Sequence, residues 1–370
     1  MDSALKADLA ATPLTRPPAD KDAVRAFADR YVQMLNDGML CLMISVGHRT
    51  DLFDAMADGA PATSAAIAER AGLNERYVRE WLGAMTTGRI VTYDPEARTY
   101  RLPPAHAAIL GRGAGPEAAS SMSRFVGLLG AVESQIVQCF REGGGVPYGA
   151  FTDFVGLMAE HSAVGVDARL LSVRLPLVPG LVDRLRLGID VADVGCGSGH
   201  ALNVMAAAYP KSRFVGYDFS DDALAAARAE ADAKGLTNVR FVAKDVSTLD
   251  EIDRFDLITS FDAIHDQAHP DRVLAAIRKA LRRDGVYLCL DIHASSDVSR
   301  NLDHRLGPLV YTISTMHCMT VSLALGGAGL GTAWGEELAL SMLKDAGFGR
   351  VDVRYVDRET LNTYYIAYPG

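Results

Sequence analysis

The sequence has few cysteines and no long uninterrupted apolar segment. Its five cysteines are odd in number and scattered, and no two form a Cys-x-x-Cys pair. This argues against a disulfide framework and against a structural zinc site. No run of about 18 or more apolar residues is present, so we expect no membrane-spanning segment. Because no basic segment followed by an apolar one opens the chain, we expect no signal peptide and a cytoplasmic location.

The sequence also has fewer basic than acidic residues. The chain has 37 Lys and Arg against 46 Asp and Glu, a net charge of −9. This balance weighs against broad binding to nucleic acid or anionic membranes, although a local basic patch is compatible with it. With 49% hydrophobic and 22% charged residues the chain is typical of a globular protein. Its 370 residues are more than one ordinary domain needs.

A glycine-dense turn follows an apolar segment in the middle of the chain. Val191 to Val194 reads as a strand, Gly195 to Gly199 as a turn, and Ala201 to Ala208 as a helix, the context in which nucleotide-like ligands bind. A dinucleotide site needs a small residue three places after the second glycine, where this chain has His200. The pattern Asp193-x-Gly195-x-Gly197-x-Gly199 instead resembles the first motif of class I S-adenosylmethionine (SAM) methyltransferases.

The segments that follow resemble the same family in order. The expected strands are 212–217, 239–242, 255–260, 285–292, 350–355 and 362–368, with a helix over 221–234. The resemblance implies an α/β fold in which a Rossmann-like, seven-stranded class I methyltransferase domain follows an α-helical winged-helix domain. It also implies that SAM is the cofactor and S-adenosylhomocysteine (SAH) the product.

The resemblance assigns cofactor-binding residues at the ends of these strands. Asp218 is placed to accept hydrogen bonds from both ribose hydroxyls, as acids do in dinucleotide sites, and Asp245 lies at the adenine edge. The expected set is Asp193, Gly195, Gly197, Gly199, Asp218, Phe219, Asp245, Val246 and Phe261.

The N-terminal third has the pattern of a winged helix. After a frayed segment 1–20 rich in Ala, Pro and Thr, the helical and winged-helix domain is expected over 21–113. Asp22 to Ala57 is helical in pattern, and two helices (64–71 and 75–85) and a hairpin (90–93 with 99–102) follow. The second of these two helices carries Glu75 and Glu80 beside Arg76 and Arg79, which disfavours DNA binding. In the winged-helix methyltransferases that the architecture resembles, this module mediates dimerisation, so a homodimer is expected.

The rest of the chain divides into a helical connector over 114–180, which lines the pocket, and the methyltransferase domain over 181–370. Within that domain, residues 294–332 form an insertion that commonly acts as a wall or lid in this fold. Its glycine run, Gly326 to Gly331, follows no strand and is interpreted as a flexible hinge.

His265 and Asp266 are the first candidates for chemistry. They resemble the His-Asp step of small-molecule O-methyltransferases, in which the histidine is the general base, although Gln267 stands where that family usually has Trp. Asp266 would orient the ring. The plainer alternative is a histidine that caps a loop beside a solvated acid. His265 and His269 are four residues apart, but Pro270 places them in a loop, so no metal site is expected.

Further candidates lie mainly in the insertion. His317 is a second catalytic candidate, and Tyr311, Cys318 and Trp334 are expected to touch substrate. Tyr311, Ser314 and Cys318 follow helical spacing and could share one stripe; the alternative is a core helix with satisfied polar groups. His293 and His161 are weaker substrate candidates.

The sequence therefore predicts methyl transfer from SAM to a small molecule, with an O-methyltransferase using a histidine base as the first hypothesis. An N-, S- or C-methyltransferase is the alternative within the same family. A winged-helix transcriptional regulator with a SAM-like sensing domain, or a SAM-binding domain with another activity, are the alternatives outside it.

Overall fold

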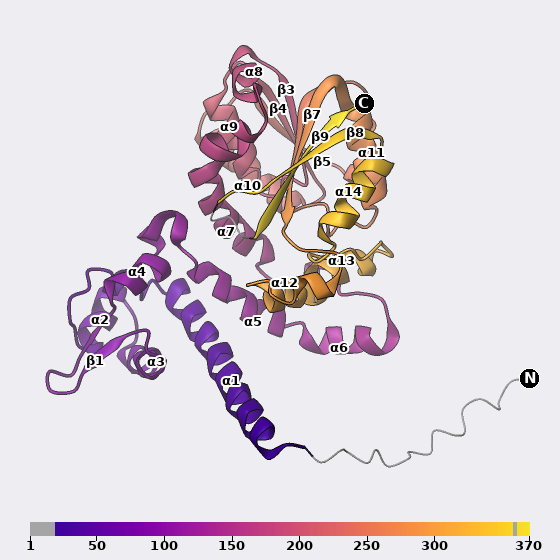
Figure 1. The fold of residues 1–370 in the computed structure, drawn as a ribbon. Helices are drawn as coiled ribbons and strands as arrows, with labels where there is room; N and C mark the ends of the chain where they lie inside the picture. Colours follow the sequence, from indigo (N-terminus) through magenta and orange to yellow (C-terminus); the bar gives the residue numbers. More distant parts are fainter. Residues whose placement is uncertain (1–18, 358–360) are drawn as a thin grey trace, which may run out of the picture. The chain divides into compact units, whose positions relative to one another are not determined.

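The computed structural model describes residues 19–357 and 361–370. The segment 1–20, expected to be frayed, lies almost entirely outside the described residues. The chain divides between Pro104 and Ala105 into two compact units, which Figure 1 colours from indigo to yellow along the sequence. Among the described residues, no helix is both long and apolar enough to cross a membrane.

The first unit is a winged helix, as predicted. Its elements are α1 (Lys21–Arg49), α2 (Ser64–Ala71), α3 (Glu75–Thr87), β1 (Thr92–Asp94) and β2 (Thr99–Arg101). The hydroxyl of Thr63 caps α2 by accepting from the Ala66 N–H, and left-handed Gly72 ends that helix. The antiparallel strands β1 and β2 form the wing.

Helix α1 differs from the sequence-based expectation. The helical pattern over Asp22–Ala57 becomes one continuous helix of 29 residues, which ends at Arg49. A short 3-10 turn over Asp54–Met56 follows. Most of the apolar residues of α1 are exposed, which is unusual for a helix with this many of them.

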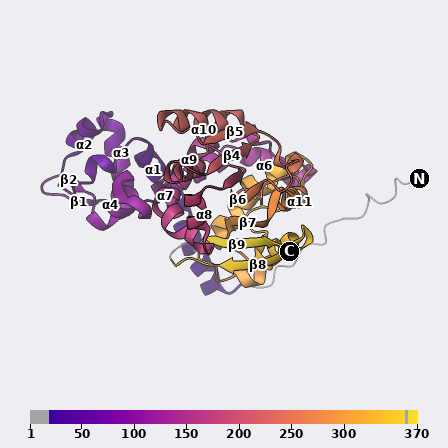
Figure 2. The same ribbon diagram turned by 90° about the horizontal axis from the view of Figure 1, so that it is seen from above.

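The second unit contains the predicted seven-stranded sheet. Its strands are β3 (Asp190–Val194), β4 (Arg213–Asp218), β5 (Val239–Ala243), β6 (Phe255–Phe261), β7 (Leu281–Ile292), β8 (Phe348–Arg354) and β9 (Asn362–Pro369). Their order is β5-β4-β3-β6-β7-β9-β8. Neighbours among β3 to β7 pair in parallel, whereas β9 runs antiparallel to both β7 and β8. Figure 2 shows β5 and β8 toward opposite edges.

Helices cover both faces of this sheet (Figure 1). The helices of the unit are α4 (Pro104–Leu110), α5 (Arg124–Gly130), α6 (Glu133–Glu142), α7 (Phe154–Arg169), α8 (Leu181–Leu187), α9 (His200–Ala208), α10 (Asp221–Ala233), α11 (Pro270–Ala280), α12 (Gly307–Ile313), α13 (Met319–Ala324) and α14 (Gly335–Asp345). Residues of α7 to α10 build the core on one face, and α11 and α14 build the core on the other. The carboxyl ends of the parallel strands are left to carry the functional loops.

The insertion after β7 contains a π-helical turn, Ser314–Cys318, between α12 and α13. A π turn holds one more residue than an α turn, so the helical spacing used to place Tyr311, Ser314 and Cys318 on one stripe does not hold here. Ser314 and Cys318 are buried, whereas Tyr311 is partly exposed.

Candidate active site

The glycine turn after β3 is shaped by two backbone hydrogen bonds. The N–H groups of Gly195 and Cys196 both donate to the Tyr217 carbonyl at the end of β4. A Cβ on Gly195 would lie 2.6 Å from that of Ala263, whereas one on Gly197 would meet nothing within 4 Å. Both glycines have positive φ, 71° and 52°, so glycine is needed for conformation at each. The turn therefore opens toward free space at Gly197.

Asp218 organises this turn from the neighbouring strand. One of its carboxylate oxygens accepts from the Gly197 N–H at 2.8 Å, and the other accepts from the Ser220 N–H at 2.9 Å. The carboxylate is buried at the end of β4. Each oxygen keeps a further lone pair, so the same carboxylate can hold the turn and accept from a ligand hydroxyl.

Asp193 lies beneath the turn and is fully buried. Its carboxylate accepts from the Thr259 hydroxyl at 2.7 Å. Burial raises the pKa of Asp193 to about 7, against the opposing effect of the Thr259 hydrogen bond and with a smaller contribution from Asp218. Asp193 therefore lies behind the glycine turn as a buried supporting residue.

The remaining residues of the expected cofactor set surround the same edge of the sheet. Gly199 packs between Ala227 and Phe241, where a Cβ would lie about 2.5 Å from the ring. Asp245 is exposed after β5 and accepts from the Ser247 N–H at 2.9 Å, while Val246 is buried. Phe261 is partly buried, and Phe219 is largely exposed.

His265 forms a buried dyad with Asp291. Nδ1 of His265 lies 2.6 Å from Oδ1 of Asp291 at the end of β7, and both side chains are almost completely buried. Burial by itself lowers the pKa of His265, but the Asp291 carboxylate outweighs it and holds that pKa well above its usual value. With Nδ1 bound to Asp291, Nε2 is the nitrogen that remains for proton exchange, and the Cys318 side chain also hydrogen-bonds to this ring.

Two further carboxyl groups lie close to this dyad. Asp262 has a left-handed backbone, φ 52°, and accepts from the Asn362 amide at 3.2 Å. Burial raises its pKa to about 7, helped by the nearby Asp291. Burial also raises the pKa of Asp266 to about 6, although His265 opposes this. A left-handed backbone at a non-glycine residue, as at Asp262, is found mainly at functional sites.

His317 lies in an aromatic cluster near His265. Its ring stacks on Phe154 with centroids 3.7 Å apart and meets the edges of Phe151 and Tyr148 at 4.5 and 5.7 Å. The side chain has no exposed surface. Burial, followed by the charge of His265, lowers the pKa of His317 to about 3, so the ring is neutral at pH 7.

The other candidates from the insertion have different surroundings. Cys318 lies between the two histidines: its sulfur is 3.6 Å from Nδ1 of His317, and burial raises the pKa of its thiol against the effect of His265. Trp334 is buried, and its indole N–H donates to Oδ1 of Asp291 at 3.2 Å. The hydroxyl of Tyr311 accepts from Asn301. The indole of Trp334 thus helps to fix the Asp291 carboxylate of the dyad.

The glycine run that was interpreted as a hinge is tied to the His265 loop. The Gly331 N–H donates to the His265 carbonyl, and the Ala328 N–H donates to the Ala268 carbonyl. A Cβ on Gly327 would lie 2.5 Å from Ala268. Close packing against this loop therefore explains the glycines more directly than hinge freedom.

His293 and His161 are placed outside the dyad. His293 lines a cavity of about 470 Å³ with His304 and Tyr355, and its Nδ1 lies 2.8 Å from the Thr363 hydroxyl. His161 is half-buried on α7, and burial lowers its pKa. Among the described residues, neither histidine forms a hydrogen bond or a ring contact with His265.

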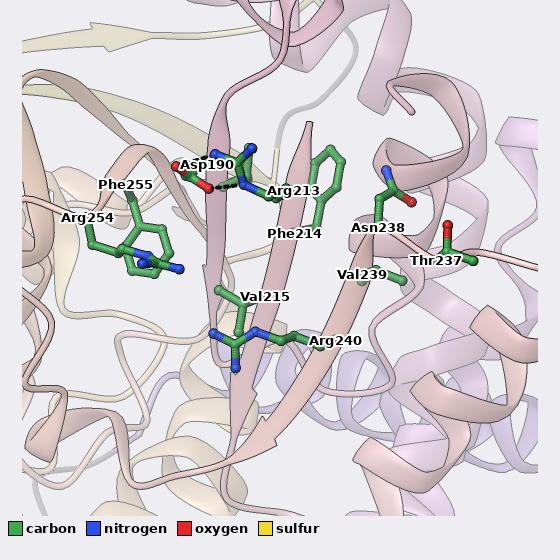
Figure 3. A pocket seen from close by; sticks show the side chains of 11 residues that line it. Asp190, Arg213, Phe214, Val215, Thr237, Asn238, Val239, Arg240, Arg254 and Phe255 are labelled. Atoms are coloured by element: carbon green, nitrogen blue, oxygen red, sulfur yellow. Dashed lines mark hydrogen bonds and ion pairs between the residues drawn. The ribbon is translucent and has the colours of Figure 1, made fainter. Parts of the chain in front are cut away.

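A second cavity, of about 210 Å³, lies at the amino ends of the parallel strands, opposite the carboxyl ends that carry the glycine turn (Figure 3). The amino ends of β3 to β6 line it, and two of the lining residues, Asp190 and Arg213, form an ion pair at 2.7 Å. None of the predicted site residues lines this cavity. In the described parts of the chain, no group of three or more His, Cys, Asp or Glu could hold a metal ion.

Sequence reasoning missed several of these residues. In the sequence, Asp291 is distinguished only as an acid at the end of an apolar strand. That position was the one signal that could have indicated a functional role. Tyr148, Phe151 and Phe154 recur every third residue after a Gly-Pro break, but nothing in that spacing indicated which face they would cover.

Two domain families match the chain. Residues 38–112 match the Rv2258c-like winged HTH domain, and residues 186–347 match a methyltransferase domain. A curated trans-aconitate 2-methyltransferase of Deinococcus radiodurans is 31% identical over 186 residues, which are 49% of this chain and 64% of that protein. The chain thus matches less than two thirds of the length of this relative.

Solved structures show the same fold over nearly the whole chain. A protein of Nostoc punctiforme assigned as an O-methyltransferase has a TM-score of 0.70 at 17% identity, with 95% of this chain and 100% of that chain covered. Human N-acetylserotonin methyltransferase, solved with SAM, has a TM-score of 0.64 at 17% identity, with 96% and 99% covered. At such identities the likeness establishes the shared fold.

Proposed function

Because the chain belongs by fold and domain content to the class I SAM-dependent methyltransferases with an N-terminal winged-helix domain, we propose that it methylates a hydroxyl group of a small molecule. The observation that carries this proposal is the buried His265–Asp291 dyad at the carboxyl end of the sheet. A hydroxyl acceptor must lose its proton during methylation, and an oriented imidazole is suited to remove it.

In this proposal Nε2 of His265 takes the proton of the acceptor hydroxyl. Asp291 holds Nδ1, so the neutral ring carries its proton on Nδ1 and its lone pair on Nε2, and Trp334 in turn fixes Asp291. Because the same carboxylate raises the pKa of His265, this neutral form gains population as the pH rises. Since these three side chains are all buried, water is kept away from the base. His265 is therefore the proposed base, and Asp291 and Trp334 are the proposed positioning residues.

The residues at the glycine turn fit SAM. The turn opens to free space at Gly197, and Asp218 lies beside it with lone pairs available for ribose hydroxyls. Asp245 and Phe219 are exposed at the neighbouring strand ends, where they can reach the adenine. When bound, SAM supplies a methyl group on a sulfonium, whose carbon–sulfur bond breaks as the new oxygen–carbon bond forms.

Methylation of nitrogen, sulfur or carbon is the alternative within the same chemistry. The Cys318 thiol beside His265 and the Gln267 position keep this alternative open. Transcriptional regulation is disfavoured by α3, where Arg76 pairs with Glu80 and Arg79 with Glu75. Guanidinium groups already paired with carboxylates are poorly placed to neutralise phosphates.

A second copy of the chain is the proposed partner of α1. The apolar residues Phe27, Tyr31 and Leu35 follow one another at helical spacing and are about half exposed or more. A contiguous apolar stripe of this kind marks a protein interface. The proposal is a homodimer formed through the first unit.

Titration calorimetry with SAM and SAH, followed by methyl-transfer assays on phenols, amines and thiols, tests the function. Micromolar binding of both ligands and transfer to a phenol support the proposal. Replacing His265 by Gln should lower turnover by about 10²- to 10⁴-fold and leave SAM affinity within a factor of about three. Retained turnover would place the base elsewhere, and absent SAM binding in folded protein would overturn the proposal.

A further inference from the structure

The described structure leaves one part of the sheet without a covering helix, over the first residues of β4 and β5. In the described connection from β5 to β6, residues 244–254, the only helical turn is the 3-10 turn Val246–Thr248. Residues of α9 and α10 belong to the core on the other face, and α11 packs against β7. The cavity at the amino ends of the strands lies at this uncovered part (Figure 3).

The floor of this cavity is apolar. Val215 and Phe255 line it, and both belong to the core on the uncovered face of the sheet. Because side chains alternate along a strand, Arg213 shares this face with Val215. Arg240 is the neighbour of Val215 in the parallel register of β4 and β5, so its side chain begins on the same face. A ligand in the cavity would therefore meet both apolar side chains and guanidinium groups.

The charge of the cavity is positive, in contrast to the net charge of −9 of the whole chain. Three arginines and one aspartate are the charged residues that line it. Asp190 is paired with Arg213, and its carboxylate also accepts from Arg282. The side chains of Arg240 and Arg254 form no ion pair with any described residue. These two guanidinium groups are therefore available to an anionic ligand.

The two available arginines approach each other. In Figure 3 the side chains of Arg240 and Arg254 extend toward each other from opposite sides of the cavity. Burial, followed by Glu251, raises the pKa of Tyr217 to about 12, and both guanidinium groups oppose this, so both lie close to the same hydroxyl. Glu251 accepts from that hydroxyl at 3.3 Å and does not line the cavity.

We propose that this cavity binds a small phosphate ester, whose phosphate group bridges Arg240 and Arg254 and whose apolar part lies on Val215 and Phe255. A phosphate ester has three free oxygens, enough for both guanidinium groups, whose planar donor pairs match phosphate geometry. The cavity of about 210 Å³ is smaller than the about 300–1,000 Å³ of pockets for drug-sized ligands, so the ester must be small. This site is separate from the proposed function, because the glycine turn and the dyad lie at the opposite ends of the strands.

Calorimetry on the full-length protein with phenyl phosphate, inorganic phosphate and benzoate tests the proposal. Phenyl phosphate should bind about fivefold or more tightly than inorganic phosphate, because its ring covers the apolar floor. It should also exceed benzoate by about fivefold, since benzoate has one charge and only two oxygens. No saturable binding of phenyl phosphate up to about 10 mM overturns the proposal. Equal binding of benzoate overturns the choice of phosphate, and equal binding of inorganic phosphate overturns the apolar contact.

Two variants test the residues assigned to the phosphate. Arg240→Gln and Arg254→Gln should each weaken phenyl phosphate binding by about fivefold. Both side chains are exposed, so these variants should fold as the wild type does. Arg272→Gln, exposed on α11 and outside the cavity, removes the same charge and is the matched control. An equal loss of affinity in all three variants would show a general attraction of anions and overturn the site.

Competition with SAH tests the location of the ligand. Because the cavity and the glycine turn lie at opposite ends of the parallel strands, saturating SAH should change the affinity for phenyl phosphate by less than about twofold. Displacement of phenyl phosphate by SAH would place the ligand in the cofactor site and overturn the assignment. None of these measurements uses methyl transfer, so a failure of the proposed O-methyl transfer is distinguishable from a failure of this site.

Discussion

Asp291 binds two side chains at a single oxygen: its Oδ1 accepts from the indole of Trp334 and lies 2.6 Å from Nδ1 of His265. Of the two residues that it joins, His265 lies in the loop after β6 and Trp334 directly precedes α14 as its N-cap. One strand-end carboxylate therefore fixes the base to both neighbouring elements. Its second oxygen, Oδ2, has no partner among the described residues.

Asp291→Asn should change the pH dependence of catalysis. Asp291 raises the pKa of His265, and the base acts only when it is neutral, so wild-type activity should rise with pH through that raised value. Without the carboxylate, burial dominates and the midpoint should move to lower pH. The maximal rate should also fall by roughly tenfold or more as the ring loses its orientation. Asp345→Asn, on the exposed end of α14, is the control, and an unmoved midpoint in D291N would contradict the dyad.

Asp218→Asn should weaken SAM binding. The substitution keeps the side-chain shape but removes the charge that strengthens hydrogen bonds to ligand hydroxyls, a loss of about 1.5 kcal/mol or about tenfold in affinity. Asp222→Asn, exposed in the first turn of α10, is the matched control. Calorimetry with SAM measures both variants. Since Asp218 also holds Gly197 and Ser220, the melting temperature is recorded alongside.

Leu35→Lys should separate the proposed dimer. Leu35 is about half exposed within the apolar stripe of α1, and a charge there would be buried in an interface between two copies at high cost. Gln33→Lys places the same side chain on the opposite face of the helix, next to Asp37, and serves as the control. Light scattering after size-exclusion chromatography measures the mass. A monomeric wild type would contradict the proposal, and so would a dimer that persists in the Leu35→Lys variant.

The strands and the glycine turn could be predicted because local pattern determines them. Apolar runs that end in Gly195 or Asp218 indicate parallel strands and the positions of their carboxyl ends. The resemblance to class I methyltransferases supplied the order of the strands. The dyad could not be predicted in the same way. His265 and Asp291 are separated by 26 residues, and Asp266, next to His265 in sequence, was the nearer guess for its partner. Which acid reaches the ring depends on how a loop folds against a strand end.

The same limit applies to the aromatic cluster around His317 and to the insertion. Helical spacing predicted a stripe through Tyr311 and Cys318, but the π turn over Ser314–Cys318 shifted the register. His317 was flagged by residue type alone. Its ring partners Phe151 and Phe154 come from more than 150 residues earlier in the chain, a tertiary contact that no local pattern encodes.

SAM binding should release protons between about pH 6 and 7. Burial raises the pKa of Asp262 to about 7 and that of Asp266 to about 6, so both carboxyl groups are partly protonated in that range. A bound sulfonium nearby would favour the charged carboxylates and lower both values. SAM affinity should therefore increase as the pH rises from 5.5 to 7.5, whereas SAH, which lacks the sulfonium charge, should show a weaker increase.

Calorimetry in buffers of different ionisation enthalpy counts the released protons, and Asp262→Asn should reduce the count for SAM more than for SAH. Without ligand, the stability of the folded protein depends on pH in the opposite direction to SAM affinity. A carboxyl group whose folded pKa exceeds its unfolded value stabilises the protein below about pH 4, and that contribution is lost as the pH rises through about 7. The Asp262→Asn protein should therefore lose part of the decline in melting temperature over this range. Equal proton release with SAM and SAH would show that these carboxyl groups do not sense the sulfonium.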